Sequence, residues 1–298
     1  MEYLDNFLKK VDNEKLNINY IQVYKNDKLI DEYSKIQPKT RLNVYSVAKS
    51  ITSIGVGIAL QEKLIELDDK IYTFFPQINF DKLNPLIKKI TIENLLTMTS
   101  GLKSKLFFCD DPERYRVKDW VSYYFNSDFV YEPGTHFDYS TFNTYILSCV
   151  IESASGASLL DYMTPRFFEK IGIGNPNWLA CPMGHTFGAH SLMLTIDEMS
   201  KIGSFLLHEG NYNGEQILSQ SYIKKATTNK IAMSNVKSKY GYGYQFWINK
   251  DKISYRADGK LGQFIIVVPD SKLVVSVQSF EQRKLYDIIW SNLVVPYM

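Results

Sequence analysis

The sequence has few cysteines, no excess of either charge and no long apolar run, and each shortage excludes a class of protein. Its three cysteines, Cys109, Cys149 and Cys181, are odd in number and form no CxxC pair. This usage favours a reducing compartment and thiols that act as small core residues. The 34 basic and 32 acidic residues leave a net charge of +2, which gives no reason to expect nucleic acid or an anionic membrane as a partner.

Targeting, membrane and cofactor motifs are also missing. The first residues lack the basic segment and apolar stretch of a signal peptide, so we expect a cytoplasmic protein, although a chain trimmed of its leader would start in the same way. The apolar run at residues 54–60 is too short to span a bilayer. No HExxH, GxSxG, GxGxxG, Walker loop or Cys/His metal spacing occurs, so we expect neither metal nor cofactor.

What remains is an ordinary globular composition, 45% hydrophobic and 22% charged, with strand patterns at both ends of the chain and helix patterns between them. Strands are expected at residues 17–25, 29–34, 244–248, 253–257, 263–268 and 273–279. Helices are expected at residues 1–13, 46–62, 91–98, 143–153, 158–170, 195–209 and 281–293.

The simplest fold for this order is one antiparallel sheet built from both chain ends and flanked by helices. Residues 1–65 and 240–298 would form this α/β lobe. Residues 66–239 would form a second, mainly helical lobe, and a cleft would lie between the two.

Four serines stand three residues before a lysine, a spacing that puts a hydroxyl and an amine on one helical face. The pairs are Ser46/Lys49, Ser100/Lys103, Ser221/Lys224 and Ser234/Lys237. A neutral lysine so placed can take the serine proton, but its ordinary pKa of ~10.4 must first be lowered by burial or a nearby cation. Only Ser46 and Lys49 begin a small, apolar helix pattern, where a buried lysine is costly unless it is functional. An ordinary helix start is the equally open alternative.

Residues 43–52, NVYSVAKSIT, resemble the first motif of the class C β-lactamase-like serine hydrolases. This group includes penicillin-binding esterases, D-amino-acid peptidases and 6-aminohexanoate-dimer hydrolases. Similar motifs follow in the family's order at residues 90–102, 132–140, 194–199, 240–244 and 257–263. The resemblance implies the two-lobed α+β fold of β-lactamases, with the active site in the cleft between the lobes.

The same resemblance implies roles for single residues. Ser46 would be the acylated nucleophile and Lys49 its proton partner. Tyr139 falls on the family's catalytic tyrosine, which exchanges protons with the serine and the leaving group, and Lys49 would support its phenolate. A core tyrosine is the alternative. The oxyanion hole would be formed by the backbone N–H groups of Ser46 and of Lys260, the residue after Gly259.

Two positions depart from the family pattern. Thr141 stands where asparagine is usual, and Asn143 is the nearest asparagine. Ala257-Asp258-Gly259 replaces Lys-Thr-Gly and supplies no cation for the carboxylate of a β-lactam. This argues against efficient β-lactamase activity and favours the esterase and 6-aminohexanoate-dimer hydrolase branch. Asp258 would either attract a substrate amine or be a surface-turn aspartate.

The sequence therefore predicts a serine hydrolase that acts through an acyl-enzyme on a small ester or amide. Candidate substrate contacts are Thr141, Asn143, His190, Asp258 and Gly259, and His190 is equally open to a structural reading. The alternatives are a penicillin-binding or sensor protein that acylates with little turnover, a weak class C-type β-lactamase, and a non-catalytic interaction protein. The natural substrate and the oligomeric state do not follow from the sequence.

Overall fold

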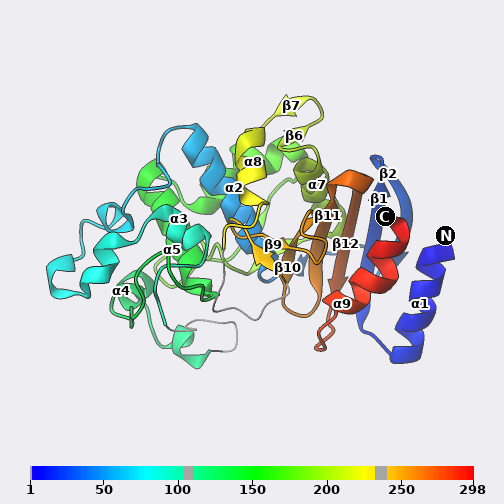
Figure 1. Ribbon diagram of the computed structural model, residues 1–298, viewed down its shortest axis with the longest axis horizontal. Coiled ribbons are helices and arrows are strands. Elements are labelled where there is room, and N and C mark those ends of the chain that lie inside the picture. Colours follow the sequence, from blue (N-terminus) through cyan, green and yellow to red (C-terminus); the bar gives the residue numbers. More distant parts are fainter. Residues whose placement is uncertain (1, 104–110, 232–239) are drawn as a thin grey trace.

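The computed structural model describes residues 2–103, 111–231 and 240–298 (Figure 1). Within these ranges the main sheet has seven strands in the order β2-β1-β12-β11-β10-β9-β8. Their bounds are β1 Ile18–Lys25, β2 Lys28–Ser34, β8 Gly241–Tyr242, β9 Trp247–Ile248, β10 Tyr255–Gly259, β11 Gln263–Val268 and β12 Leu273–Ser279. The first strand pairs antiparallel with the last, with Val23 opposite Val275, so both chain ends build the sheet as expected.

Helices cover the two faces of this sheet. Alternation sends Phe264 and Ile266 of β11 to the outer face, where they pack with α1 (Glu2–Glu14) and α9 (Tyr286–Ile289). Ile265 and Val267 point the other way, into the core that the sheet shares with the helical region. The two termini consequently lie on the same side of the molecule (Figure 1).

Helices and short turns fill the middle of the chain. The α-helices there are α2 Val47–Gln61, α3 Ile92–Leu96, α4 Trp120–Phe125, α5 Thr141–Ser155, α6 Leu159–Met163, α7 Ile196–Leu207 and α8 Gln220–Ala226. Small sheets join β3 Leu42–Asn43, β5 Leu192–Leu194 and β4 Asn177–Trp178, and β6 Asn211–Tyr212 with β7 Glu215–Gln216. The capping box predicted at Thr195 and Glu198 is confirmed, and Thr91 and Asn94 form another.

Other bounds shift by a few residues, as for β10, but three expected elements differ more, each for a local reason. The strand expected at 244–248 is a bend followed by the short strand β9, because Gln245 takes φ +65 and its side chain donates to the Leu95 and Leu96 carbonyls at the C-terminal end of α3. The helix expected at 158–170 leaves α geometry after Met163, where a π-helical turn, Thr164–Phe168, follows with Pro165 near its start. The last helix begins at Tyr286 instead of residue 281, because Glu281 accepts hydrogen bonds from the N–H groups of Asn17 and Arg283.

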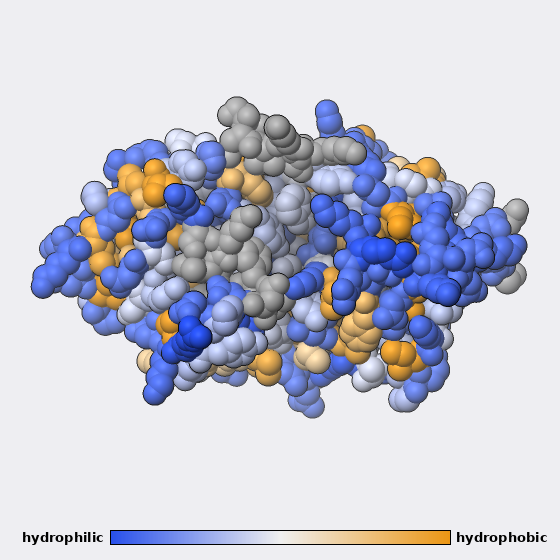
Figure 2. All heavy atoms as spheres, turned by 90° about the horizontal axis from the view of Figure 1, so that it is seen from below, coloured by the Kyte–Doolittle hydropathy of each residue, from blue (hydrophilic) through white to orange (hydrophobic). Residues whose placement is uncertain are grey.

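One apolar core runs from the sheet through α2 into the helical region, and it includes Val44, Ile51 and Ile265. The lobe boundaries at 65/66 and 239/240 therefore stay predictions. No helix in the described ranges combines the length and apolarity needed to cross a membrane. On the face shown in Figure 2, hydrophobic residues form small separate patches on a mainly hydrophilic surface.

Candidate active site

Ser46 stands at the N-terminus of α2, directly after a strained residue. Tyr45 has φ +47, a left-handed conformation that costs about 1–3 kcal/mol for a residue with a side chain. The side-chain oxygen of Asn43 accepts the Tyr45 N–H at 2.9 Å, and the Leu192 carbonyl accepts the Val44 N–H at 3.0 Å. These bonds to β3 and β5 fix the turn that presents Ser46.

Lys49 lies one helical turn after Ser46 and is 1% exposed. Its Nζ is 3.0 Å from the Ser46 Oγ and donates to the Ala189 carbonyl at 3.0 Å. The amine is therefore held beside the hydroxyl by a backbone acceptor from a different part of the chain. A lysine in this position can exchange a proton with the serine.

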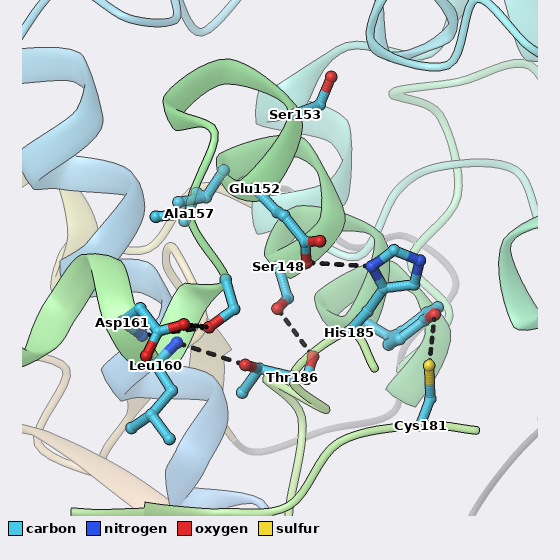
Figure 3. Close-up of polar contacts among 12 residues, drawn as sticks. Ser148, Glu152, Ser153, Ala157, Leu160, Asp161, Cys181, His185 and Thr186 are labelled. Atoms are coloured by element: carbon cyan, nitrogen blue, oxygen red, sulfur yellow. Dashed lines mark hydrogen bonds and ion pairs between the residues drawn. The ribbon is translucent and has the colours of Figure 1, made fainter. Parts of the chain in front are cut away.

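Contacts on α5 hold the loop that carries the Ala189 carbonyl (Figure 3). The Ser148 hydroxyl donates to the Thr186 carbonyl at 2.8 Å, and His185 Nδ1 lies 3.0 Å from a Glu152 carboxylate oxygen. Cys181, a buried free thiol as predicted, contacts the Tyr145 hydroxyl at 3.3 Å. The loop that carries the lysine acceptor is thus held from α5.

Tyr139 reaches Ser46 from the segment before α5. Ser46 acts on the Tyr139 phenol as a hydrogen-bonding neighbour that lowers its pKa, and the Tyr139 ring centroid lies 5.1 Å from the Lys49 Nζ. Trp247 stacks on the ring with centroids 5.6 Å apart. Burial raises the pKa of the Tyr139 phenol well above its ordinary value, and the charge of Asp258 adds to this against the opposing Ser46 bond. This favours a protonated phenol in the resting protein over the phenolate that the resemblance implies.

The end of β10 touches the backbone of the Ser46 turn. A Cβ added at Gly259 would lie 2.3 Å from the Val44 carbonyl oxygen and 3.3 Å from the Ser46 nitrogen. Only glycine permits this approach, which brings the start of the 259–260 peptide beside Ser46. An oxyanion hole made by the N–H groups of Ser46 and Lys260 remains a prediction that this contact supports.

Replacing Gly259 with alanine is expected to push β10 away from the Ser46 turn. Displacing catalytic groups by about 1 Å typically lowers kcat/KM about 100-fold, and we expect a loss of at least that order with an activated ester. Gly174 is the control, because a Cβ there meets nothing within 4 Å. If Gly259→Ala keeps the kcat/KM of Gly174→Ala, the close approach has no catalytic role.

Two of the predicted substrate contacts are buried in the protein interior. Thr141 is 5% exposed and Asn143 is 1% exposed. The Asn143 side-chain oxygen accepts hydrogen bonds from Ser100 Oγ at 2.9 Å and from the Tyr124 hydroxyl at 3.2 Å. These contacts favour a structural role for Asn143 over the predicted substrate contact. They also engage the second Ser-x-x-Lys serine, Ser100, in packing.

Asp258 pairs with a cation that the sequence reading overlooked. Arg256 Nε lies 2.9 Å from Asp258 Oδ2, and the arginine side chain is 4% exposed. The guanidinium also lies 3.6 Å from the Tyr286 ring centroid and donates to Asn249 Oδ1 at 2.9 Å. Burial raises the Asp258 pKa, and Arg256 opposes that rise. An already paired Asp258 attracts a substrate amine less than the sequence suggested.

The i, i+2 alternation of a strand could have revealed this pair. Arg256 and Asp258 face the side of the sheet shared by Ile266 and Phe264, whereas Ala257 faces the opposite side. The family's lysine position therefore carries no charge, and the nearest cation on β10 points the other way.

His190 lies next to the acceptor of Lys49 and is 6% exposed. Its Nδ1 is 2.6 Å from Ser191 Oγ, and its ring lies 4.6 Å from the Phe187 ring. Burial, then the charges of Lys49 and Arg114, lower the pKa of His190 to about 3. The imidazole is neutral at physiological pH and belongs to the wall of the site.

The remaining Ser-x-x-Lys copies do not reach this site in the described part of the chain. Ser221 is exposed on α8, where its hydroxyl lies 3.3 Å from that of Ser219. Ser234, Lys237 and Cys109 lie outside the described residues. Of the four pairs, the structure places Ser46 and Lys49 together with Tyr139 and Gly259.

Comparison with known sequences identifies one family. A sequence model described as Beta-lactamase matches residues 19–283. An uncharacterized protein of Alkalihalophilus pseudofirmus is 27% identical over 278 residues, which cover 82% of this chain and 75% of that protein. Protein flp of Staphylococcus aureus is 27% identical over 146 residues, which cover 48% of this chain and 29% of flp.

Solved structures share the whole fold at lower identity. A Bacillus anthracis protein described as a candidate 6-aminohexanoate-dimer hydrolase has a TM-score of 0.83 at 20% identity, covering 97% of this chain and 81% of its own. The octameric penicillin-binding protein homologue from Pyrococcus abyssi has a TM-score of 0.78 at 19% identity, covering 99% of this chain and 77% of its own. A D-stereospecific amidohydrolase from Streptomyces has a TM-score of 0.74 at 15% identity, covering 98% of each chain. The two-lobed α+β arrangement is confirmed.

Proposed function

The chain belongs to the beta-lactamase family, and from this premise we propose that it is a serine hydrolase that forms an acyl-enzyme at Ser46. The observation that carries the proposal is the 3.0 Å contact between Ser46 Oγ and the buried Lys49 Nζ. The Tyr139 phenol, whose pKa Ser46 lowers, would be a second proton carrier beside the serine. The substrate would be a small ester or amide that enters between the α/β lobe, residues 1–65 and 240–298, and the helical lobe, residues 66–239.

The proposed reaction requires that Lys49 first release its resting proton; the Ser46 oxygen then attacks the substrate carbonyl carbon and its proton passes to the neutral amine. The N–H groups of Ser46 and Lys260 would hold the oxyanion. As the C–O or C–N bond breaks, Tyr139 gives its proton to the leaving group and receives one from Lys49. Water then attacks the acyl-enzyme and loses a proton to these same groups, which return it to the Ser46 oxygen as the acid leaves.

The β10 residues support an esterase or amidase over an efficient β-lactamase. Ala257 supplies no cation, and Arg256 on the same strand is already paired with Asp258. A β-lactam carboxylate would find no free cation among these three strand residues. A weak class C-type β-lactamase, or a penicillin-binding or sensor protein that acylates with little turnover, is the alternative.

A substrate panel followed by intact-protein mass measurement tests the proposal. The panel comprises p-nitrophenyl esters, D-amino-acid amides, linear amide oligomers and a chromogenic cephalosporin. Continuous turnover of an ester or amide supports the hydrolase, whereas one equivalent of retained ring-opened β-lactam supports the sensor. If no substrate is hydrolysed or retained and fluorophosphonate forms no adduct on Ser46, both the hydrolase and the sensor are excluded.

Replacing Tyr139 with phenylalanine is expected to slow the hydrolysis of amides more than the hydrolysis of activated esters. General acid catalysis contributes about 100- to 10,000-fold, and we expect losses in that range for amides, whose amine leaving group must be protonated. A p-nitrophenolate leaves without a proton, so its ester should lose much less. Tyr131→Phe is the control, since Tyr131 stacks on His136 through its ring. Equal losses for amide and ester would contradict a leaving-group role for Tyr139.

A further inference from the structure

Arg114 carries a buried hydrogen-bond donor for which the described residues, 2–103, 111–231 and 240–298, supply no acceptor. It lies in the 3-10 turn Pro112–Tyr115, and its Nη1 is buried without a hydrogen-bond partner. The acidic neighbour Glu113 pairs instead with Arg116 at 2.9 Å. No ion pair joins Arg114 to a carboxylate in the described ranges. Buried donors are normally satisfied by protein or by water, so this donor is open to an acceptor on a bound ligand.

A chain of ring contacts connects Arg114 to the candidate active site. Its guanidinium carbon is 5.7 Å from the Phe187 ring centroid, and the Phe187 ring is 4.6 Å from that of His190. His190 follows Ala189, whose carbonyl binds Lys49. The charges of Arg114 and Lys49 both act on the His190 ring. Arg114 therefore lies along the same wall of the site as the lysine acceptor.

The platform under Arg114 is rigid and uncharged. Trp120 stacks on Phe187 with centroids 4.9 Å apart and an angle of 6° between the rings. The buried His190 is neutral above about pH 4, since its pKa is about 3. Phe187, Trp120 and His190, which lie between Arg114 and Lys49, are therefore all uncharged.

We propose that Arg114 binds a carboxylate of the substrate, so that the preferred esters or amides of this enzyme are anionic. The inference rests on the proposed hydrolase function and names its substrate class. A guanidinium matches a carboxylate with two parallel N–H bonds, and such charge-assisted bonds are strong where water is excluded.

Matched ester pairs test this proposal. In one arm, 4-nitrophenyl hemiglutarate is compared with 4-nitrophenyl pentanoate, so that the carboxylate lies on the acyl group. In the other, the butyrate ester of 4-hydroxybenzoate is compared with phenyl butyrate, so that it lies on the leaving group. The kcat/KM of each ester is measured for the wild type, Arg114→Gln, Arg114→Lys and Arg116→Gln.

We expect the wild type to prefer the anionic ester in one arm. Hydrogen bonds to charged groups correspond to about 10- to 100-fold in affinity, so Arg114→Gln should lower kcat/KM for that ester by this factor through KM. The neutral ester should change less than about twofold, since it makes no charged contact. Arg114→Lys should keep part of the preference, and added salt should weaken it. Arg116 is 74% exposed in its side chain, and Arg116→Gln should leave every value unchanged.

Two outcomes would overturn the inference. A wild type with no anionic preference in either arm leaves Arg114 without a carboxylate to bind. Equal losses for both members of a pair in Arg114→Gln, with a lowered melting temperature, would make Arg114 a packing residue. In both cases, continued hydrolysis of the neutral esters and fluorophosphonate labelling of Ser46 would leave the proposed hydrolase standing. Loss of that labelling in the wild type would overturn the hydrolase as well.

Discussion

Replacing Ser46 with alanine is expected to abolish the acyl-enzyme and lower kcat by about 100,000-fold or more, as for other covalent serine nucleophiles. The hydroxyl lies 3.0 Å from the Lys49 amine, and alanine removes the atom that would bond the substrate carbonyl. The measurements are steady-state hydrolysis of the best ester in the panel and intact mass after fluorophosphonate treatment. The fold should persist, because Ser46 makes no side-chain cap on α2.

The chain offers a matched control for this variant. Ser221 also precedes a lysine by three residues on a helix, but it is exposed on α8. Ser221→Ala should therefore keep wild-type kcat and wild-type labelling. Ester hydrolysis that survives Ser46→Ala at the wild-type rate would exclude Ser46 as the nucleophile.

Replacing Lys49 with methionine is expected to lower kcat about 1,000- to 10,000-fold, within the range for a lost general base. Methionine approximates the length of the side chain but cannot carry a proton. The melting temperature should stay the same or rise, because a buried amine at 1% exposure is replaced by an apolar group. Activity and stability should thus move independently or in opposite directions.

Lys224→Met is the matched control for the lysine. Lys224 follows Ser221 in the same spacing, has a 64% exposed side chain, and pairs with Glu209 at 3.3 Å. Surface pairs of this kind contribute about 0–1 kcal/mol, so this variant should keep its kcat and lose little stability. Full activity in Lys49→Met would remove the lysine from the proposed proton path.

The sheet and the Ser46–Lys49 pair were predictable because local patterns specify them. Both β1 and β12 are rich in valine, isoleucine and leucine. A one-turn spacing within a helix puts Ser46 and Lys49 side by side by local geometry alone. The capping box at Thr195 is equally local. The family resemblance then gave the order of the remaining motifs.

The parts that could not be predicted depend on contacts between distant segments. Arg114 reaches Phe187 only because the turn at Pro112–Tyr115 folds against the 185–191 loop. The internal bonds of Asn143 to Ser100 and Tyr124 likewise join three separate segments. The spacing of residues along one helix or strand does not predict such contacts between distant segments.

The pairing of the first strand with the last also has a consequence for synthesis. Val23 finds its partner Val275 only after about 250 further residues have been made. At about 5–20 residues per second, the β1–β2 hairpin emerges from the ribosome roughly 10–50 s before β12. During that time one edge of a buried, apolar strand stays unpaired. The nascent chain is therefore an expected client of chaperones, and slow C-terminal translation should lower its soluble yield more than slow translation elsewhere.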